Sequence, residues 1–159
     1  MIRCTFHLNG GRLSNLSCPG IGFFPAYSGN AGPHRNNPGS AVLQDIGPLP
    51  PGKYHIVNRP KGGAMGILRD QINSLLSGSD RTLWLGLFRD DGTIDDYTFI
   101  EYVRRGNFRL HPAGYQGVSN GCITLPNHFH YAILRKALLR APTTPLSGGL
   151  ISYGTIQVY

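Results

Sequence analysis

The sequence predicts a mainly β protein of the α+β class, folded as a single domain over residues 1–159. Several short runs alternate apolar and polar residues, which is the pattern of strands with one buried face. The 22 glycines and 12 prolines are spread along the chain, as expected where many turns join short strands. A chain of 159 residues can bury about two-thirds of its surface around one core, so folding does not require a metal or disulfide scaffold.

The first half is expected to form a hairpin, a long loop and a strand. Residues 2–8 alternate as a strand, residues 9–11 form a turn, and residues 13–18 return. From Phe24 to Pro48, glycine, proline and asparagine are frequent and regular patterns are few. Loops of that length often have a function, so we expect this one to be a substrate loop. Pro51 and Gly52 then begin a strand over residues 54–57.

The second half is expected to add two short helices and further strands. Apolar residues at positions 67, 68, 72, 75 and 76 share one helical face, which ends at Gly78, and a second helix is expected over residues 127–139. Residues 83–87 alternate into a hairpin whose turn is residues 90–92, and residues 97–103 follow as one strand. The remaining strands are residues 122–125, 151–153 and 156–158.

The charge narrows the possible partners. Fifteen basic and eight acidic side chains give a formal charge of +7, which suits nucleic acid, a membrane surface or the cell wall. The basic residues are scattered and form no basic helix interleaved with aromatic residues, which argues against nucleic acid. No apolar run reaches the roughly 18 residues of a membrane span, and the N-terminus lacks the apolar core of a signal peptide. We therefore expect synthesis in the cytoplasm without Sec export, and no stable membrane insertion.

The strongest chemical signal is the pair His111 and Cys122, eleven residues apart. A thiol is a nucleophile only as thiolate, and a histidine beside it can take the proton and lower the thiol pKa. Gly114 and Gly117 allow the chain between them to fold back, and the turn at residues 119–121 leads Cys122 into an apolar strand. The backbone N–H groups of Gly121 and Cys122 would then form an oxyanion hole. The alternative is a buried structural cysteine beside a surface histidine.

This run resembles the motif of the L,D-transpeptidase (YkuD-like) family: a histidine, a glycine-rich spacer, Ser or Thr, one further residue, then Gly, Cys and an apolar residue. The matching positions are His111, Ser119, Gly121, Cys122 and Ile123. Residues 50–54 resemble a second element of that family, a Pro-x-Gly-x-aromatic strand entry. More narrowly, residues 27–30, 36–38, 47–52, 91–96 and 105–112 resemble the Tlde1 (DUF2778) branch, antibacterial effectors delivered by type VI secretion. Asn120 stands where the wider family usually has His, a departure that this branch shares.

The resemblance implies a fold and a reaction. The fold would be a YkuD-like β-sandwich with two short helices and long substrate loops. Cys122 would attack the carbonyl of meso-diaminopimelate in peptidoglycan tetrapeptide stems, expel the terminal D-alanine and form a thioester. Water would resolve the thioester in an L,D-carboxypeptidase, and an amine would resolve it in an L,D-transpeptidase or by D-amino-acid exchange. The protein would act in the periplasm of target bacteria without cofactor or metal, with a secretion apparatus and an immunity protein as partners.

Other residues have candidate roles beside the pair. The main-chain carbonyl of Pro112 would fix the His111 tautomer, as the family uses a backbone carbonyl. Ser119 either braces the turn or donates to the substrate. Arg109, on the same strand face as His111, binds a stem carboxylate or pairs with an acidic residue at position 95, 96 or 101. The further substrate-binding candidates are Pro112, Asn120, Tyr27, Ser28 and Asn30.

The other cysteines and histidines carry weaker signals. Cys4 and Cys18 either form a disulfide across the N-terminal hairpin or remain two buried thiols. His128 and His130 are two residues apart and point apart on a helix, so they do not suggest a metal site. The acidic residues between positions 90 and 96 lack the spacing of a calcium loop.

Two other functions remain as alternatives. A papain-like cysteine peptidoglycan endopeptidase would place its histidine well downstream of the cysteine, whereas His128 and His130 follow Cys122 by only six and eight residues. A non-catalytic wall-binding module is the second alternative, and analysis of muropeptides after incubation would separate it from an enzyme.

Overall fold

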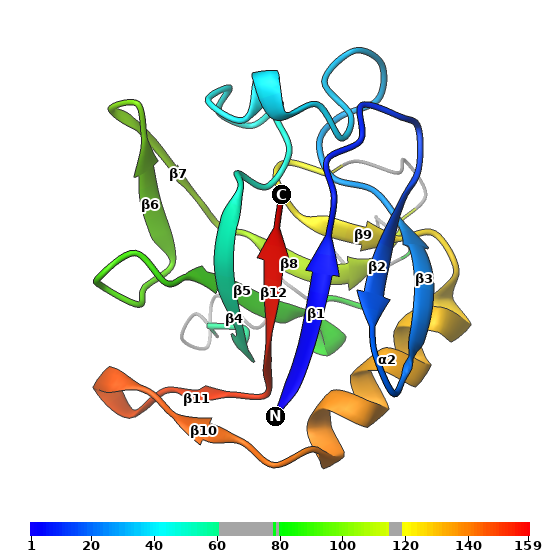
Figure 1. The fold of residues 1–159 in the computed structure, drawn as a ribbon, viewed down its shortest axis with the longest axis vertical. Helices are drawn as coiled ribbons and strands as arrows, with labels where there is room; N and C mark the ends of the chain where they lie inside the picture. The colour runs from blue at the N-terminus through cyan, green and yellow to red at the C-terminus, as the bar shows by residue number, and fades with distance from the viewer. Residues whose placement is uncertain (61–77, 79, 115–118) are drawn as a thin grey trace.

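The computed structural model describes residues 1–60, 78, 80–114 and 119–159, and its main element is one eight-stranded sheet (Figure 1). The strand order is β3-β2-β1-β12-β4-β5-β8-β9. In chain order these strands are β1 (Ile2–Phe6), β2 (Ser14–Cys18), β3 (Gly22–Ala26), β4 (Gly52–Asn58), β5 (Leu85–Arg89), β8 (Arg109–Pro112), β9 (Ile123–Leu125) and β12 (Gly154–Val158). β1 and β12 are parallel, as are β8 and β9, and the other neighbours are antiparallel. The predicted mainly β class is confirmed.

The sheet curls until its two edges meet. Tyr27, the residue after β3, forms an isolated bridge with Thr124 of β9. The Tyr27 N–H donates to the Thr124 carbonyl at 3.0 Å, and the Thr124 N–H donates back at 2.9 Å. Strand twist accumulates across eight strands and brings the edges together. The expected sandwich therefore takes the form of one nearly closed sheet around its core.

The helix α2 (His128–Arg140) packs against β8 and β9 and covers part of the core (Figure 1). It begins at Asn127, whose side chain accepts hydrogen bonds from the N–H groups of Phe129 and His130. Its buried residues recur at helical spacing and enter the core: Tyr131, Leu134 and Leu138. The helix predicted over residues 127–139 is confirmed, whereas the one predicted over residues 67–76 lies outside the described residues.

The region between β5 and β8 differs from the prediction. β5 pairs with β4 and β8 and forms no hairpin with the strand that follows it. Instead, β6 (Tyr97–Ile100) and β7 (Val103–Gly106) form a separate hairpin that projects from the sheet (Figure 1). Its turn residues, Glu101 and Tyr102, have φ of 46° and 69°. No glycine or asparagine marks this turn in the sequence, so the prediction of one strand over residues 97–103 is wrong.

The two ends of the chain are joined through the sheet. β12 lies between β1 and β4, and the short strands β10 (Thr144–Pro145) and β11 (Ile151–Ser152) pair beside it. Within the first hairpin, Cys4 and Cys18 lie opposite each other and form a disulfide with a Cα–Cα distance of 4.3 Å. Of the two states considered for these cysteines, the structure shows the bridge, and it leaves Cys122 as the free thiol.

Candidate active site

β8 and β9 bring His111 and Cys122 to neighbouring parallel strands. The register pairs Leu110 with Ile123 and His111 with Thr124, and Cys122 directly precedes β9. Leu110 and Ile123 belong to the hydrophobic core. Side chains alternate along a strand, so His111, Cys122 and Thr124 lie together on the opposite face. The eleven-residue separation in the sequence therefore becomes a diagonal neighbour pair on one face of the sheet.

His111 is held in one orientation and one tautomer. Its Nδ1 lies 2.7 Å from the carbonyl oxygen of Pro112, which can only accept, so Nδ1 carries the proton. This is the carbonyl contact that the sequence predicted. Nε2 lies 3.3 Å from Thr124 Oγ1, and the Trp84 ring stacks on the imidazole at 4.1 Å between centroids. Burial lowers the pKa of His111 to about 4, so near neutral pH the imidazole is uncharged and its Nε2 is an acceptor, which the Thr124 hydroxyl contacts.

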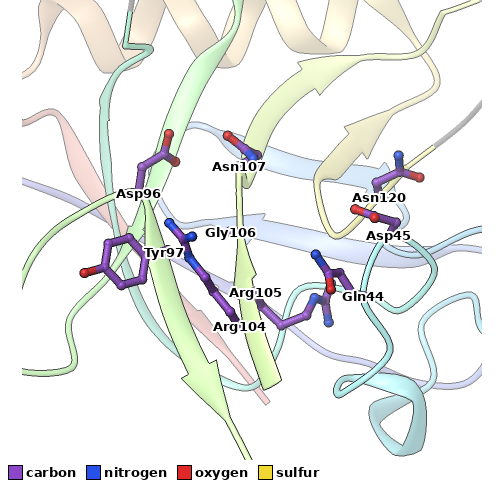
Figure 2. A pocket seen from close by; sticks show the side chains of 9 residues that line it. All are labelled: Gln44, Asp45, Asp96, Tyr97, Arg104, Arg105, Gly106, Asn107 and Asn120. Atoms are coloured by element: carbon purple, nitrogen blue, oxygen red, sulfur yellow. The ribbon is translucent and has the colours of Figure 1, made fainter. Parts of the chain in front are cut away.

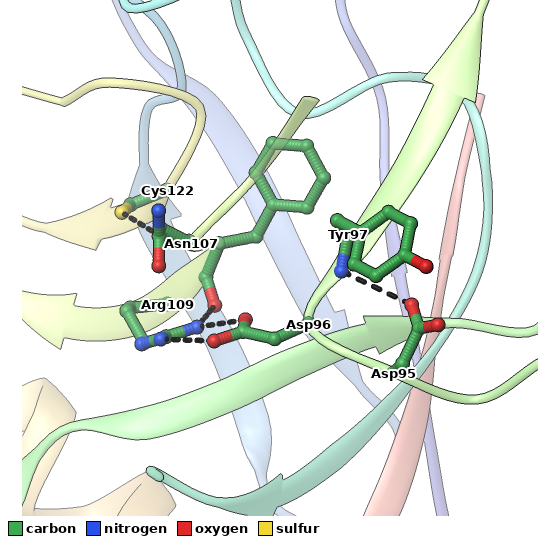
Figure 3. A network of polar contacts seen from close by, with 7 residues as sticks. Asp95, Asp96, Tyr97, Asn107, Arg109 and Cys122 are labelled. Carbon is green, nitrogen blue, oxygen red and sulfur yellow. Dashed lines mark hydrogen bonds and ion pairs between the residues drawn. The ribbon is translucent and has the colours of Figure 1, made fainter. Parts of the chain in front are cut away.

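Cys122 is buried as a neutral thiol. The residue is 7% exposed, and its Sγ donates to the carbonyl oxygen of Asn107 at 3.8 Å (Figure 3). Burial raises the pKa of the thiol to about 11. The backbone N–H and the positive charge of Arg109 lower this pKa, but by less than burial raises it. The expectation that His111 keeps the thiol pKa low is wrong for this state, because burial outweighs the favourable contacts.

The turn before Cys122 is fixed by Ser119 and Gly121. Ser119 is buried and its Oγ donates to the Cys122 carbonyl at 2.7 Å. Of the two roles considered for Ser119, the structure shows the brace. Gly121 has a φ of 88°, which side chains with a Cβ rarely adopt. A Cβ at this position would lie 2.6 Å from Nη2 of Arg105 and 2.8 Å from the ring of Phe108, so the turn requires glycine.

Arg109 is committed to an ion pair with Asp96. Its Nη1 and Nη2 donate to the two carboxylate oxygens at 2.6 Å and 2.7 Å, and Nη1 also donates to the Phe108 carbonyl at 2.8 Å (Figure 3). A bidentate pair of this kind is strong and directional. Of the two roles considered for Arg109, the structure shows pairing with an acidic residue, and contact with a stem carboxylate stays a prediction.

The loop that follows β3 contains three of the substrate candidates. Ser28 is fully buried: its Oγ accepts from the Leu49 N–H at 2.7 Å, and its own N–H donates to Asn36 Oδ1 at 2.8 Å. It therefore organises the loop, and its prediction as a substrate contact is wrong. Tyr27 closes the sheet through its backbone, and the Asn30 side chain donates to the Asp45 carbonyl at 3.1 Å. Substrate contact by these two residues stays a prediction.

The remaining candidates flank the pair. Pro112 is buried, and its carbonyl is occupied by His111, so its observed contact is with the catalytic candidate. Asn120 is exposed at the tip of the turn before Cys122 and stays a candidate for substrate contact.

Sequence reasoning missed three residues that shape the site. Thr124 follows Cys122 by two residues, so strand alternation could have placed it on the same face. Trp84 reaches His111 from the start of β5, and Arg105 reaches Gly121 from β7. No local pattern links these two to the motif, because both contacts depend on the sheet order.

The described residues offer no obvious place for a metal. Among residues 1–60, 78, 80–114 and 119–159, no three His, Cys, Asp or Glu side chains gather closely enough to hold an ion. His128 Nε2 lies 2.7 Å from the carbonyl of Ala113, and the His130 ring lies against Phe24. Within the same ranges, no helix is long and apolar enough to cross a membrane.

Comparison with known families adds one finding. A family model described as the Tlde1 domain matches residues 22–148. The comparisons with curated proteins and with solved structures find no match. The matched range covers most of the chain and includes the long loop, the β6–β7 hairpin and both His111 and Cys122. The chain therefore belongs to the Tlde1 domain family of type VI secretion effectors.

Proposed function

We propose that this effector acts on peptidoglycan as a cysteine L,D-carboxypeptidase or L,D-transpeptidase with YkuD-like chemistry. The observation that carries the proposal is the placement of Cys122 and His111 on one face of β8 and β9, with Nδ1 of His111 protonated by its contact with Pro112. That tautomer leaves Nε2 on the side of β9 as the atom able to accept a proton. A free thiol on the same face of the sheet as an oriented, neutral imidazole supports acyl transfer through a thioester.

The reaction would begin as Sγ of Cys122 attacks the carbonyl carbon of meso-diaminopimelate in a tetrapeptide stem. The thiol proton passes to His111 Nε2, and the carbonyl oxygen becomes an oxyanion held by the backbone N–H groups of Gly121 and Cys122. Collapse of this intermediate breaks the bond to D-alanine, whose nitrogen takes the proton back from Nε2. The thioester is then hydrolysed by water or attacked by the amine of a D-amino acid, and the thiol is regenerated.

The pKa values suit a concerted proton transfer. With the thiol pKa raised to about 11 and the His111 pKa lowered to about 4, an ion pair of thiolate and imidazolium is unfavourable in the free protein. Proton transfer would therefore accompany attack on the substrate. Nε2 also has to exchange its contact with Thr124 for the thiol, because the Thr124 hydroxyl lies 3.3 Å from Nε2 in the free state.

The location of the substrate fits an effector. Mature wall stems lie outside the inner membrane, and type VI secretion would place this chain in the periplasm of a target cell. The net charge of +7 favours encounter with the stem carboxylates. Trimming or exchanging the terminal D-alanine would deplete the tetrapeptides that the target uses as cross-linking donors. A producing cell would need a cognate immunity protein only where siblings deliver the effector to its own periplasm.

The alternatives are less well supported. A papain-like endopeptidase would use His128 or His130, but His128 contacts the Ala113 carbonyl at 2.7 Å and His130 lies on α2 against Phe24. A non-catalytic wall-binding module would not need the oriented imidazole beside a free thiol.

The test is mass spectrometry of tetrapeptide muropeptides incubated with the purified protein, with and without an added D-amino acid. We expect loss of D-alanine, exchange when the D-amino acid is present, and neither outcome with Cys122→Ser. The serine variant should keep the wild-type melting curve, because it retains a side chain of similar size. Intact tetrapeptides after incubation with wild-type protein would refute the proposed reaction, and full turnover by the serine variant would exclude Cys122 as nucleophile.

A second experiment tests the compartment. Expression with an appended secretion signal should cause swelling or lysis of a Gram-negative host and a fall in tetrapeptide stems, whereas expression without the signal should be nearly silent. Cys122→Ala should be silent in both compartments. Undiminished toxicity of the alanine variant would attribute the effect to a basic protein at the membrane and would contradict the proposal.

A further inference from the structure

A polar pocket adjoins the cysteine between the β6–β7 hairpin and the loop before β4. Its volume is about 310 Å³. Asn107, which lines it, is the residue whose carbonyl accepts from Cys122 Sγ, and Asn120, which also lines it, precedes Cys122 by two residues. A group seated in this pocket would therefore contact residues that adjoin Cys122.

The pocket is lined by side chains of opposite charge on its two sides (Figure 2). Arg104 lies on the hairpin side, where its guanidinium stacks on the Tyr97 ring at 4.5 Å from the centroid. Asp45 and Gln44 lie on the loop side. Both Arg104 and Asp45 are exposed, and neither forms an ion pair with a side chain in the described part of the chain.

The other charged residues of the pocket are already neutralised or enclosed. Both carboxylate oxygens of Asp96 are taken by Arg109, at 2.6 Å and 2.7 Å. The Arg105 guanidinium is buried and donates to the carbonyls of Gly47 and Pro48, each at 3.2 Å. Arg104 is therefore the exposed cation of the pocket and Asp45 its exposed anion. Burial lowers the pKa of Arg105, and the charge of Asp45 also acts on this buried guanidinium, in the direction that raises its pKa.

We propose that this pocket binds an α-amino acid group, with its carboxylate on Arg104 and its ammonium on Asp45. An anion alone would be repelled by Asp45 and a cation alone by Arg104, whereas a zwitterion satisfies both walls. This inference rests on the proposed function, which supplies such a group from two sources. One is the free end of the diaminopimelate side chain in the donor stem, and the other is a free D-amino acid that resolves the thioester.

The first test needs no catalysis. Free meso-diaminopimelate, pimelate and cadaverine are titrated into the Cys122→Ala protein, and backbone amide shifts are followed by NMR. Diaminopimelate carries both charges at each end, whereas pimelate has only carboxylates and cadaverine only ammonium groups. We expect diaminopimelate to bind most tightly and to shift the resonances of residues 104–107 and 120. Arg104→Met and Asp45→Asn should each weaken this binding about tenfold, the usual effect of losing one charge-assisted contact. Arg12→Met, in the exposed turn between β1 and β2, is the matched control and should bind as the parent does.

The second test separates the two sources. Release of D-alanine is compared for stems with diaminopimelate or lysine at the third position, since lysine lacks the side-chain carboxylate. If the pocket holds the donor side chain, Arg104→Met lowers the preference in kcat/KM for the diaminopimelate stem about tenfold. If it holds the acceptor, that preference is unchanged and the ratio of exchange to hydrolysis with added D-methionine falls instead.

The outcomes also separate this inference from the proposed reaction. If wild-type protein releases no D-alanine but binds diaminopimelate tightly and through Arg104, the proposed reaction is refuted and the binding site is supported. If wild-type protein is active, and Arg104→Met and Arg12→Met have the same diaminopimelate binding, stem preference and exchange ratio, the pocket assignment is overturned and the proposed reaction is supported.

Discussion

Replacing Gly121 by alanine should destabilise the protein more than the backbone conformation alone explains. The φ of 88° costs an alanine about 1–2 kcal/mol. The added Cβ would also lie 2.6 Å from Arg105 Nη2 and 2.8 Å from a carbon of the Phe108 ring, and both neighbours are buried. Forcing an extra carbon into such a site typically costs a further 1–3 kcal/mol or so, which gives a total of about 2–5 kcal/mol. Thermal unfolding followed by circular dichroism measures the loss.

Gly20→Ala provides the matched control. Gly20 has a φ of 85°, and nothing lies within 4 Å of its Cβ position, so its substitution carries the backbone cost without the clash. For a domain of this size each kcal/mol lowers the melting temperature by about 2–4 °C, so Gly121→Ala should melt roughly 2–12 °C below Gly20→Ala. Equal melting temperatures for the two variants would show that Arg105 and Phe108 do not confine the turn that carries Cys122.

Three further predictions concern pH, the disulfide and the buried ion pair. The pKa of His111 is lowered from 6.5 to about 4 in the folded state, so the unfolded state binds the proton first as the pH falls. The free energy of unfolding should therefore drop by about 2–3 kcal/mol between pH 7.5 and 4.5. Urea titrations measure this drop, which should be smaller in His111→Asn. The Cys4–Cys18 bridge spans 14 residues, so Cys4→Ser should lower the free energy of unfolding by about 3 kcal/mol, and a reductant should then have no further effect on that variant. Replacing either Arg109 or Asp96 alone should lower the free energy of unfolding more than replacing both, because a single substitution leaves a buried or half-buried charge unpaired. A double-mutant cycle measures this coupling, and additive losses would contradict it.

The elements that could be predicted from the sequence are those with a local signal. The alternation of apolar and polar residues predicted β1 and β2, and the helix predicted from Asn127 is α2. The spacing of His111 and Cys122 predicted the face of the sheet on which both side chains lie. Strand periodicity of two residues is enough for that last step, since it places both side chains on the same side once the strands are neighbours.

The features that escaped prediction depend on contacts between distant parts of the chain. The turn at Glu101 and Tyr102 has no glycine to mark it, so β6 and β7 read as one strand. The stacking of Trp84 on His111 depends on β5 lying beside β8. The depth at which Cys122 is buried is also invisible in the sequence, and that burial reversed the expected direction of its pKa shift.

The central position of β12 has a consequence for how the protein acquires its structure. Ile2 pairs with Gly154, and β12 in turn pairs with β4, so the middle of the sheet joins residues that are about as far apart in the sequence as the chain permits. Closing so long a loop costs conformational entropy before any contact compensates for it, which makes folding slow compared with that of proteins dominated by local contacts. Without β12, only the bridge between Tyr27 and Thr124 joins β3-β2-β1 to β4-β5-β8-β9, and only the second group bears His111 and Cys122. We therefore expect β12 to dock late as the chain folds.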